Sequence, residues 1–120
     1  MSKSILAIDN AEMFLNSLKR YLANTPYELT CVTSGHAALE YLDGQNLKPD
    51  LILMDVEMPE MNGYELTRKI KERGIKSPVV FITANSEQED YDKAIEAGAV
   101  SVLSKPFRTN QLLDKINEYI

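Results

Sequence analysis

The sequence has little of what builds disulfide-rich, secreted or membrane-spanning proteins. It contains a single cysteine, Cys31, among 120 residues, which excludes an intrachain disulfide and a zinc site made of cysteines. Its apolar runs are all short. None has the length of a signal-peptide core or of a transmembrane helix. We therefore expect a cytoplasmic protein that does not associate with a membrane.

The sequence also has fewer basic than acidic residues. The chain has 13 Lys and Arg against 18 Asp and Glu, which gives a net charge of −5. Without a stripe of basic residues, we expect no direct contact with nucleic acid. The one histidine, His36, lies at the start of an expected helix and is a poor candidate for phosphorylation. Repeats, low-complexity tracts and linkers are lacking, so we expect one domain over residues 1–120.

Five short apolar runs alternate with amphipathic stretches along the chain. The expected strands cover residues 3–9, 27–33, 51–54, 78–83 and 99–104. Parallel strands need crossover connections, which helices supply, so this alternation predicts a parallel sheet. Five such units suit an α/β fold of the (βα)5 type with a doubly wound sheet and are too few for an eight-stranded barrel.

Polar residues mark the start of the last three helices, where their side chains suit the N-cap position. These residues are Asn62, Ser86 and Thr109. In the fourth helix, we expect Tyr91, Ala94 and Ile95 to face the core, and Gly98 to end the helix.

Polar side chains also stand where four of the strands end. They are Asp9 with Asn10, Asp55, Thr83 and Lys105. The carboxyl ends of parallel strands lie at one edge of the sheet, so these groups should share a pocket. Carboxylate and amide oxygens suit Mg²⁺, a lysine supplies a charge for phosphate, and an aspartate can accept a phosphoryl group. Taken singly, each has a plainer explanation as a helix cap, a turn residue or a solvated charge.

The motifs at these strand ends resemble those of response-regulator receiver domains, and the resemblance extends over the whole chain. The motifs are Ile8-Asp9-Asn10, Leu53-Met54-Asp55, Met58-Pro59, Asn62-Gly63, Thr83-Ala84 and Lys105-Pro106-Phe107. The resemblance implies a flavodoxin-like receiver fold with the strand order 2-1-3-4-5.

For the chemistry, the resemblance implies that Asp55 is the phosphoacceptor. A partner histidine kinase or phosphotransfer protein would supply the phosphoryl group, which Thr83 and Lys105 would contact. The Lys105–Pro106 peptide bond is expected to be cis. The domain would catalyse only its own phosphorylation and dephosphorylation and is not expected to be an enzyme with a metabolite as substrate.

The resemblance also implies a metal ion, Mg²⁺ or Mn²⁺. Its ligands would be Asp9, Asn10, Asp55 and the backbone carbonyl of Glu57. An output protein would bind the face formed by the fourth helix, the fifth strand and the fifth helix, with Tyr91, Val102 and Tyr119 as candidate contacts.

Two positions depart from the family pattern. Asn10 stands where a second acidic residue is usual, so we expect weaker Mg²⁺ binding. Val102 stands where an aromatic ring usually moves with the threonine, so that coupling is in doubt. These departures motivate an alternative, a phosphorylation-independent receiver that acts as a protein-binding module.

Two other classes fit the sequence poorly. A phosphatase with an aspartate nucleophile would need a second aspartate where Glu57 stands. A flavin-binding electron carrier would need a phosphate loop rich in Ser, Thr and Gly where the sequence has Asn10-Ala11-Glu12-Met13.

Overall fold

Strands and helices alternate along the whole described chain. The structure is a computed structural model that describes residues 3–46, 48–84 and 87–120. The elements are β1 (Ser4–Ile8), α1 (Glu12–Leu22), β2 (Glu28–Val32), α2 (Gly35–Asp43), β3 (Leu51–Asp55), α3 (Gly63–Glu72), β4 (Val79–Thr83), α4 (Gln88–Ala97), β5 (Ser101–Ser104) and α5 (Thr109–Tyr119).

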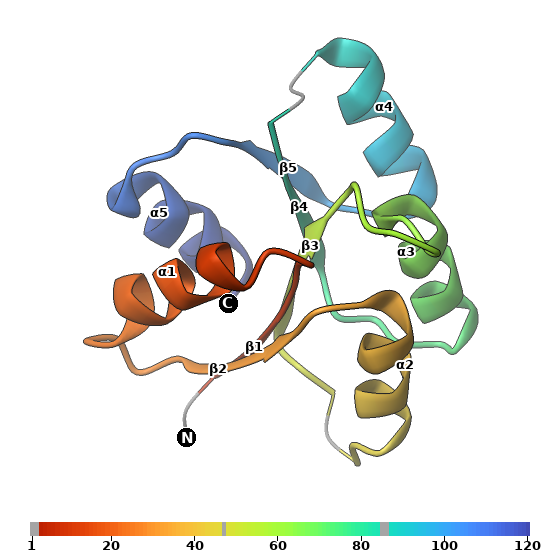
Figure 1. Cartoon of the computed structure of the whole chain (residues 1–120), viewed down its shortest axis with the longest axis horizontal. Helices are drawn as coiled ribbons and strands as arrows, with labels where there is room; N and C mark the ends of the chain where they lie inside the picture. The colour runs from red at the N-terminus through yellow and green to blue at the C-terminus, as the bar shows by residue number, and fades with distance from the viewer. Residues whose placement is uncertain (1–2, 47, 85–86) are drawn as a thin grey trace.

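The strands form one five-stranded parallel sheet in the order β2-β1-β3-β4-β5. This order confirms the predicted doubly wound topology. Helices α1 and α5 cover one face of the sheet, and α2, α3 and α4 cover the other (Figure 1). Strand order reverses between β1 and β3, and ligands of such folds bind beyond the carboxyl ends of the strands at this point.

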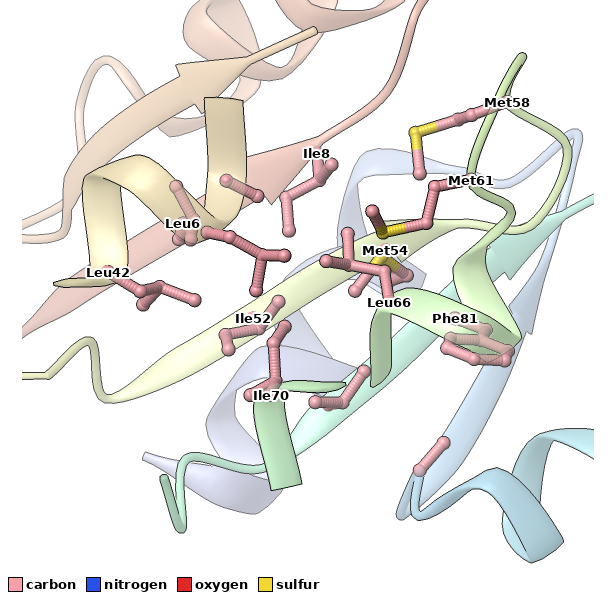
Figure 2. Close-up of a cluster of buried hydrophobic side chains, with 14 of the residues drawn as sticks. Leu6, Ile8, Leu42, Ile52, Met54, Met58, Met61, Leu66, Ile70 and Phe81 are labelled. Atoms are coloured by element: carbon pink, nitrogen blue, oxygen red, sulfur yellow. The ribbon is translucent and has the colours of Figure 1, made fainter. Parts of the chain in front are cut away.

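The core consists of two apolar layers, one on each face of the sheet. Leu6 and Ile8 of β1 point toward α2 and α3, whereas Ile5 and Ala7 point toward α1 and α5. Since helices cover both faces, the central strands are apolar at nearly every position. Figure 2 shows the first layer, in which Ile52, Leu66 and other side chains from β1, β3, α2 and α3 meet.

Of the expected helix caps, the Asn62 side chain caps α3. Asn62 accepts a hydrogen bond from the Glu65 backbone N–H at 2.9 Å, as expected. The expected cap at Ser86 lies outside the described residues. The prediction for α5 was wrong by one position, because Arg108 is the N-cap and Thr109 is the first helical residue. The Gln111 side chain satisfies the Arg108 backbone N–H at 2.7 Å, which makes a threonine cap unnecessary.

Helix α4 buries fewer of its apolar side chains than its sequence predicts. Of the three residues expected to face inward, Ala94 is fully buried, but Tyr91 and Ile95 are 42% and 39% exposed. The helix packs against α3 and β5, at the edge of the sheet, so only a narrow stripe of small residues is covered. Gly98 ends the helix in a left-handed conformation, as expected.

Within the described ranges, no helix combines the length and apolar character needed to cross a bilayer.

Candidate functional site

A cleft of about 330 Å³ opens at the carboxyl ends of β1, β3, β4 and β5. Its lining consists of Asp9, Asn10, Ala11, Asp55, Glu57, Thr83, Ala84 and Lys105. Every residue that the sequence singled out for the metal or the phosphoryl group therefore borders one cleft. The parallel sheet explains how they meet, since it brings the ends of its strands to the same edge.

Asp9, the residue after β1, has both carboxylate oxygens engaged. It is 3% exposed. Its Oδ1 accepts a hydrogen bond from the Ala11 backbone N–H at 2.8 Å, and its Oδ2 lies 3.2 Å from Lys105 Nζ. The ion pair with Lys105 offsets the cost of burying the aspartate charge.

Asp55 is the last residue of β3 and is half-buried at the floor of the cleft. Burial, reinforced by the nearby Asp9 carboxylate, raises the pKa of its carboxyl group to about 6, against the opposing effect of Lys105 and of hydrogen bonds from the Val56 and Glu57 backbones. The two carboxylates share one lysine, so the cleft keeps an excess of negative charge when both are ionised.

Thr83 and Lys105 are held together by the backbone at the ends of β4 and β5. The Lys105 N–H donates to the Thr83 carbonyl oxygen at 2.8 Å, and Thr83 is 7% exposed. The peptide bond between Lys105 and Pro106 is cis, which confirms that expectation.

The loop from β3 to α3 folds back tightly beside Asp55. Gly63 N–H donates to the Val56 carbonyl oxygen at 2.8 Å. A Cβ atom at Gly63 would overlap the Asp55 carbonyl oxygen and would lie 3.0 Å from Val56 Cα. Met58 and Met61 reach from this loop into the core beside Met54, where these methionines pack in the first apolar layer (Figure 2).

The oxygen donors around the cleft fit a hard divalent cation. They are the Asp9 and Asp55 carboxylates, the Asn10 amide and the Glu57 backbone carbonyl. Among the described residues, no group of three or more His, Cys, Asp and Glu side chains is placed to hold a metal. Because Mg²⁺ keeps several waters, two carboxylates and neutral oxygens suffice.

The Glu57 and His36 side chains lie outside this donor set. Glu57 is exposed at the cleft rim. His36 is also exposed, and its Nε2 lies 3.6 Å from the Glu60 carboxylate. Neither side chain competes with the strand-end groups for a ligand.

Two aromatic residues near the cleft escaped sequence reasoning. Phe14, on the apolar side of α1, has its ring centroid 4.1 Å from Lys105 Nζ. Tyr64, in the first turn of α3, packs edge-on against Phe81 with the ring centroids 5.4 Å apart. Both lie on helices at positions that look like ordinary core residues, so only their places, four residues after Asn10 and directly after Gly63, hinted at the cleft.

Val102 and Tyr64 both lie near Phe81. Val102 is half-buried and lies opposite Phe81 in the sheet. Tyr64 and Val102 pack against the same apolar layer. Burial and the Asp90 carboxylate raise the pKa of the Tyr64 hydroxyl.

Sequence comparisons agree with the fold. Residues 5–117 match the response regulator receiver domain family. The transcriptional regulatory protein CrdR of Helicobacter pylori is 34% identical over 120 residues, which cover 99% of this chain and 55% of that protein. The alkaline phosphatase synthesis regulatory protein PhoP of Bacillus subtilis is 30% identical over 112 residues, covering 93% of this chain and 46% of that protein. The chain thus spans about half the length of these curated relatives.

Solved structures share the architecture. The chemotaxis protein CheY4 of Vibrio cholerae superposes with a TM-score of 0.92 at 24% identity and full coverage of both chains, a likeness of fold alone. The receiver domain of a sensor histidine kinase of Pseudomonas aeruginosa has a TM-score of 0.86 at 29% identity, covering 99% of this chain and 98% of that one, and holds a magnesium ion in its active-site cleft. This chain therefore belongs to the family of response regulator receiver domains, signalling modules of two-component systems.

Proposed function

We propose that Asp55 accepts a phosphoryl group from a histidine kinase or a phosphotransfer protein. The observation that carries the proposal is the position of the Asp55 carboxyl group, half-buried at a strand end in a cleft with Lys105 and Thr83. With its pKa raised to about 6, the group is a stronger nucleophile than an exposed carboxylate and is still mostly ionised at pH 7.

The transfer needs one bond made and one broken. A carboxylate oxygen of Asp55 attacks the phosphorus, the bond from phosphorus to the donor imidazole nitrogen breaks, and its electron pair stays on that nitrogen. The Lys105 ammonium and the Thr83 hydroxyl receive the phosphoryl oxygens. In the resting structure Lys105 is paired with Asp9 at 3.2 Å, so this role requires the ammonium to turn toward the incoming group.

Asp9, Asn10, Asp55 and the Glu57 carbonyl would hold Mg²⁺ or Mn²⁺. The bound ion neutralises charge on the phosphoryl oxygens during transfer. Two findings support this assignment: the oxygen donors of the cleft, and the magnesium ion in the active-site cleft of the Pseudomonas receiver domain.

The output face would be the surface of α4, β5 and α5. Tyr91, Ile95 and Val100 expose apolar side chains there, and the Tyr119 hydroxyl donates to the Val100 carbonyl oxygen at 3.5 Å. A phosphoryl group adds about 1.5 to 2 negative charges at the cleft, which reorganises charged groups around it. We propose that an output protein reads this face.

Incubation with Mg²⁺ and phosphoramidate, followed by intact-mass and peptide analysis, tests the phosphoacceptor. We expect one phosphoryl group on Asp55, none on the Asp55→Asn variant, and normal labelling of Asp114→Asn, which alters an exposed carboxylate on α5. A wild-type protein without adduct, or an Asp55→Asn variant with the same label, would overturn the proposal.

The alternative is a binding module that works without phosphorylation, and Asn10 and Val102 favour it. Beryllofluoride, a phosphoryl mimic, separates the two functions in an NMR titration. A switch shows shifts in α4, β5 and α5, whereas a constitutive module shows shifts confined to the cleft.

A further inference from the structure

Phe14 contacts the cleft lysine from outside the polar lining. The Lys105 Nζ atom lies 4.1 Å from the centroid of the ring, well within the range in which an ammonium is attracted by the face of an aromatic ring. The Lys105 side chain is 27% exposed, so water screens the contact less than it would on an open surface.

Other rings fix the Phe14 ring in this position. Phe107 packs edge-on against Phe14, with the centroids 6.1 Å apart and the planes at 88°. Tyr21, further along α1, packs against Phe107, with the two ring centroids 6.4 Å apart. The ring face is therefore directed at the lysine by the packing of α1 against the segment after β5.

Lys105 faces two competing demands. At rest it pairs with Asp9 Oδ2, and during phosphoryl transfer it must serve a phosphoryl oxygen. Asn10 offers no second carboxylate after β1, so Asp9 and Asp55 are the two strand-end carboxylates that line the cleft with Lys105, and the Glu57 carboxylate is exposed at its rim. Attraction to a ring face uses no N–H group, so it persists whichever oxygen the ammonium bonds.

We propose that Phe14 is a positioning residue for Lys105. Its ring keeps the ammonium at the cleft while the lysine exchanges Asp9 for a phosphoryl oxygen, and this inference rests on the proposed phosphorylation of Asp55. Without the ring, the Lys105 ammonium that has left Asp9 samples positions in solvent. This weakens the binding of the phosphoryl group and slows its transfer.

The test compares rings of one shape and different electron density. Phe14 is replaced by mono-, di- and trifluorophenylalanine, and beryllofluoride affinity and the rate of phosphorylation by phosphoramidate are measured for each. Because fluorine withdraws electrons from the ring face, we expect a stepwise loss that reaches about three- to tenfold for the trifluoro ring and for Phe14→Leu. Phe14→Tyr should behave like the wild type.

Two controls separate positioning from packing. Tyr21→Leu removes a ring from the same aromatic group without touching Lys105, so its affinity should match the wild type. In the unliganded protein, NMR should show the Lys105 Hε protons shifted upfield by the Phe14 ring, and Phe14→Leu should abolish the shift.

The outcomes are distinct. If the wild-type protein takes neither beryllofluoride nor a phosphoryl group, the proposed function itself fails. If the wild type reacts and the fluorinated rings bind beryllofluoride equally well, the positioning role of Phe14 is wrong. Equal losses in Tyr21→Leu and Phe14→Leu would also overturn it, because general packing would then explain the effect.

Discussion

The Asp55 carboxyl group faces a second carboxylate in a partly desolvated position, and this arrangement costs stability. Its pKa rises from 3.8 to about 6 on folding, so the folded chain binds more protons than the unfolded chain between these values. The free energy of unfolding therefore falls as pH rises through this window. The full loss of stability is present above pH 6, and none of it remains below the pKa that Asp55 has in the unfolded chain.

We predict that Asp55→Asn stabilises the protein by about 2 kcal/mol at pH 7.5, and that the gain shrinks toward zero near pH 4. Urea unfolding of both proteins at the two pH values measures it. A gain of the same size at both would show that charge is not its cause.

Asn10 gives the cleft one charge fewer than an acidic pair would. Two unit charges about 4 Å apart interact by about 4 kcal/mol at an effective dielectric constant near 20, and desolvation removes much of that. We predict that Asn10→Asp tightens Mg²⁺ binding by about tenfold, as measured by calorimetric titration. An unchanged dissociation constant would mean that Asn10 is not near the ion.

At the residue scale, the cleft could be predicted from the sequence in its polar part only. Asp9, Asp55, Thr83 and Lys105 stand at strand ends, and the parallel topology brings them together. Phe14 could not be predicted, because an aromatic residue on the apolar side of a helix packs into the core far more often than it contacts a functional lysine. Only the three-dimensional placement of α1 against Lys105 reveals the contact.

Among the helices, α4 shows how tertiary placement overrides a helical pattern. Tyr91 and Ile95 have the spacing of core residues, yet α4 lies at the sheet edge and buries Ala94 and Ala97 instead. In contrast, α3 buries Leu66, which is fully covered. Spacing along one helix predicts which residues share a face. It does not predict how much of that face the neighbouring elements cover.

We predict that α4 opens more readily than α3. Burying two alanines anchors a helix less than burying leucine and isoleucine side chains does, so its local unfolding free energy is smaller. Native-state hydrogen exchange measures this directly: amides of α4 should exchange at least tenfold faster than those of α3. Equal protection would mean that both helices open only with the whole domain.

For the whole molecule, the sheet separates two core layers that should contribute independently to stability. Ile70 and Ile116 are both fully buried, on opposite faces. We predict that Ile70→Val and Ile116→Val each cost about 1 kcal/mol and that the double variant loses the sum within about 0.5 kcal/mol. Urea unfolding measures all three.

Ile95→Val, at an exposed position on α4, is the matched control and should change stability by less than about 0.5 kcal/mol. A double variant that loses much less than the sum would show that the layers are coupled through the sheet.

The topology was the most predictable property of the molecule. Alternating strands and helices dictate parallel crossovers, and these dictate where the strand ends meet. The pattern left undetermined local features that depend on packing, such as the cap at Arg108 and the packing of the Tyr64 ring against Phe81.

The tight return of the β3–α3 loop also has a consequence for genetics. Any missense change at Gly63 adds a Cβ atom that overlaps the backbone of Asp55, so this position, which carries no functional group, should tolerate as few alleles as Asp55, the proposed phosphoacceptor. At Gly44 the nearest atoms to an added Cβ lie at 3.6 and 3.7 Å, so alanine is accommodated. In a saturation mutagenesis screen, the intolerance of Gly63 to substitution would be mistaken for a catalytic role, although its origin is steric.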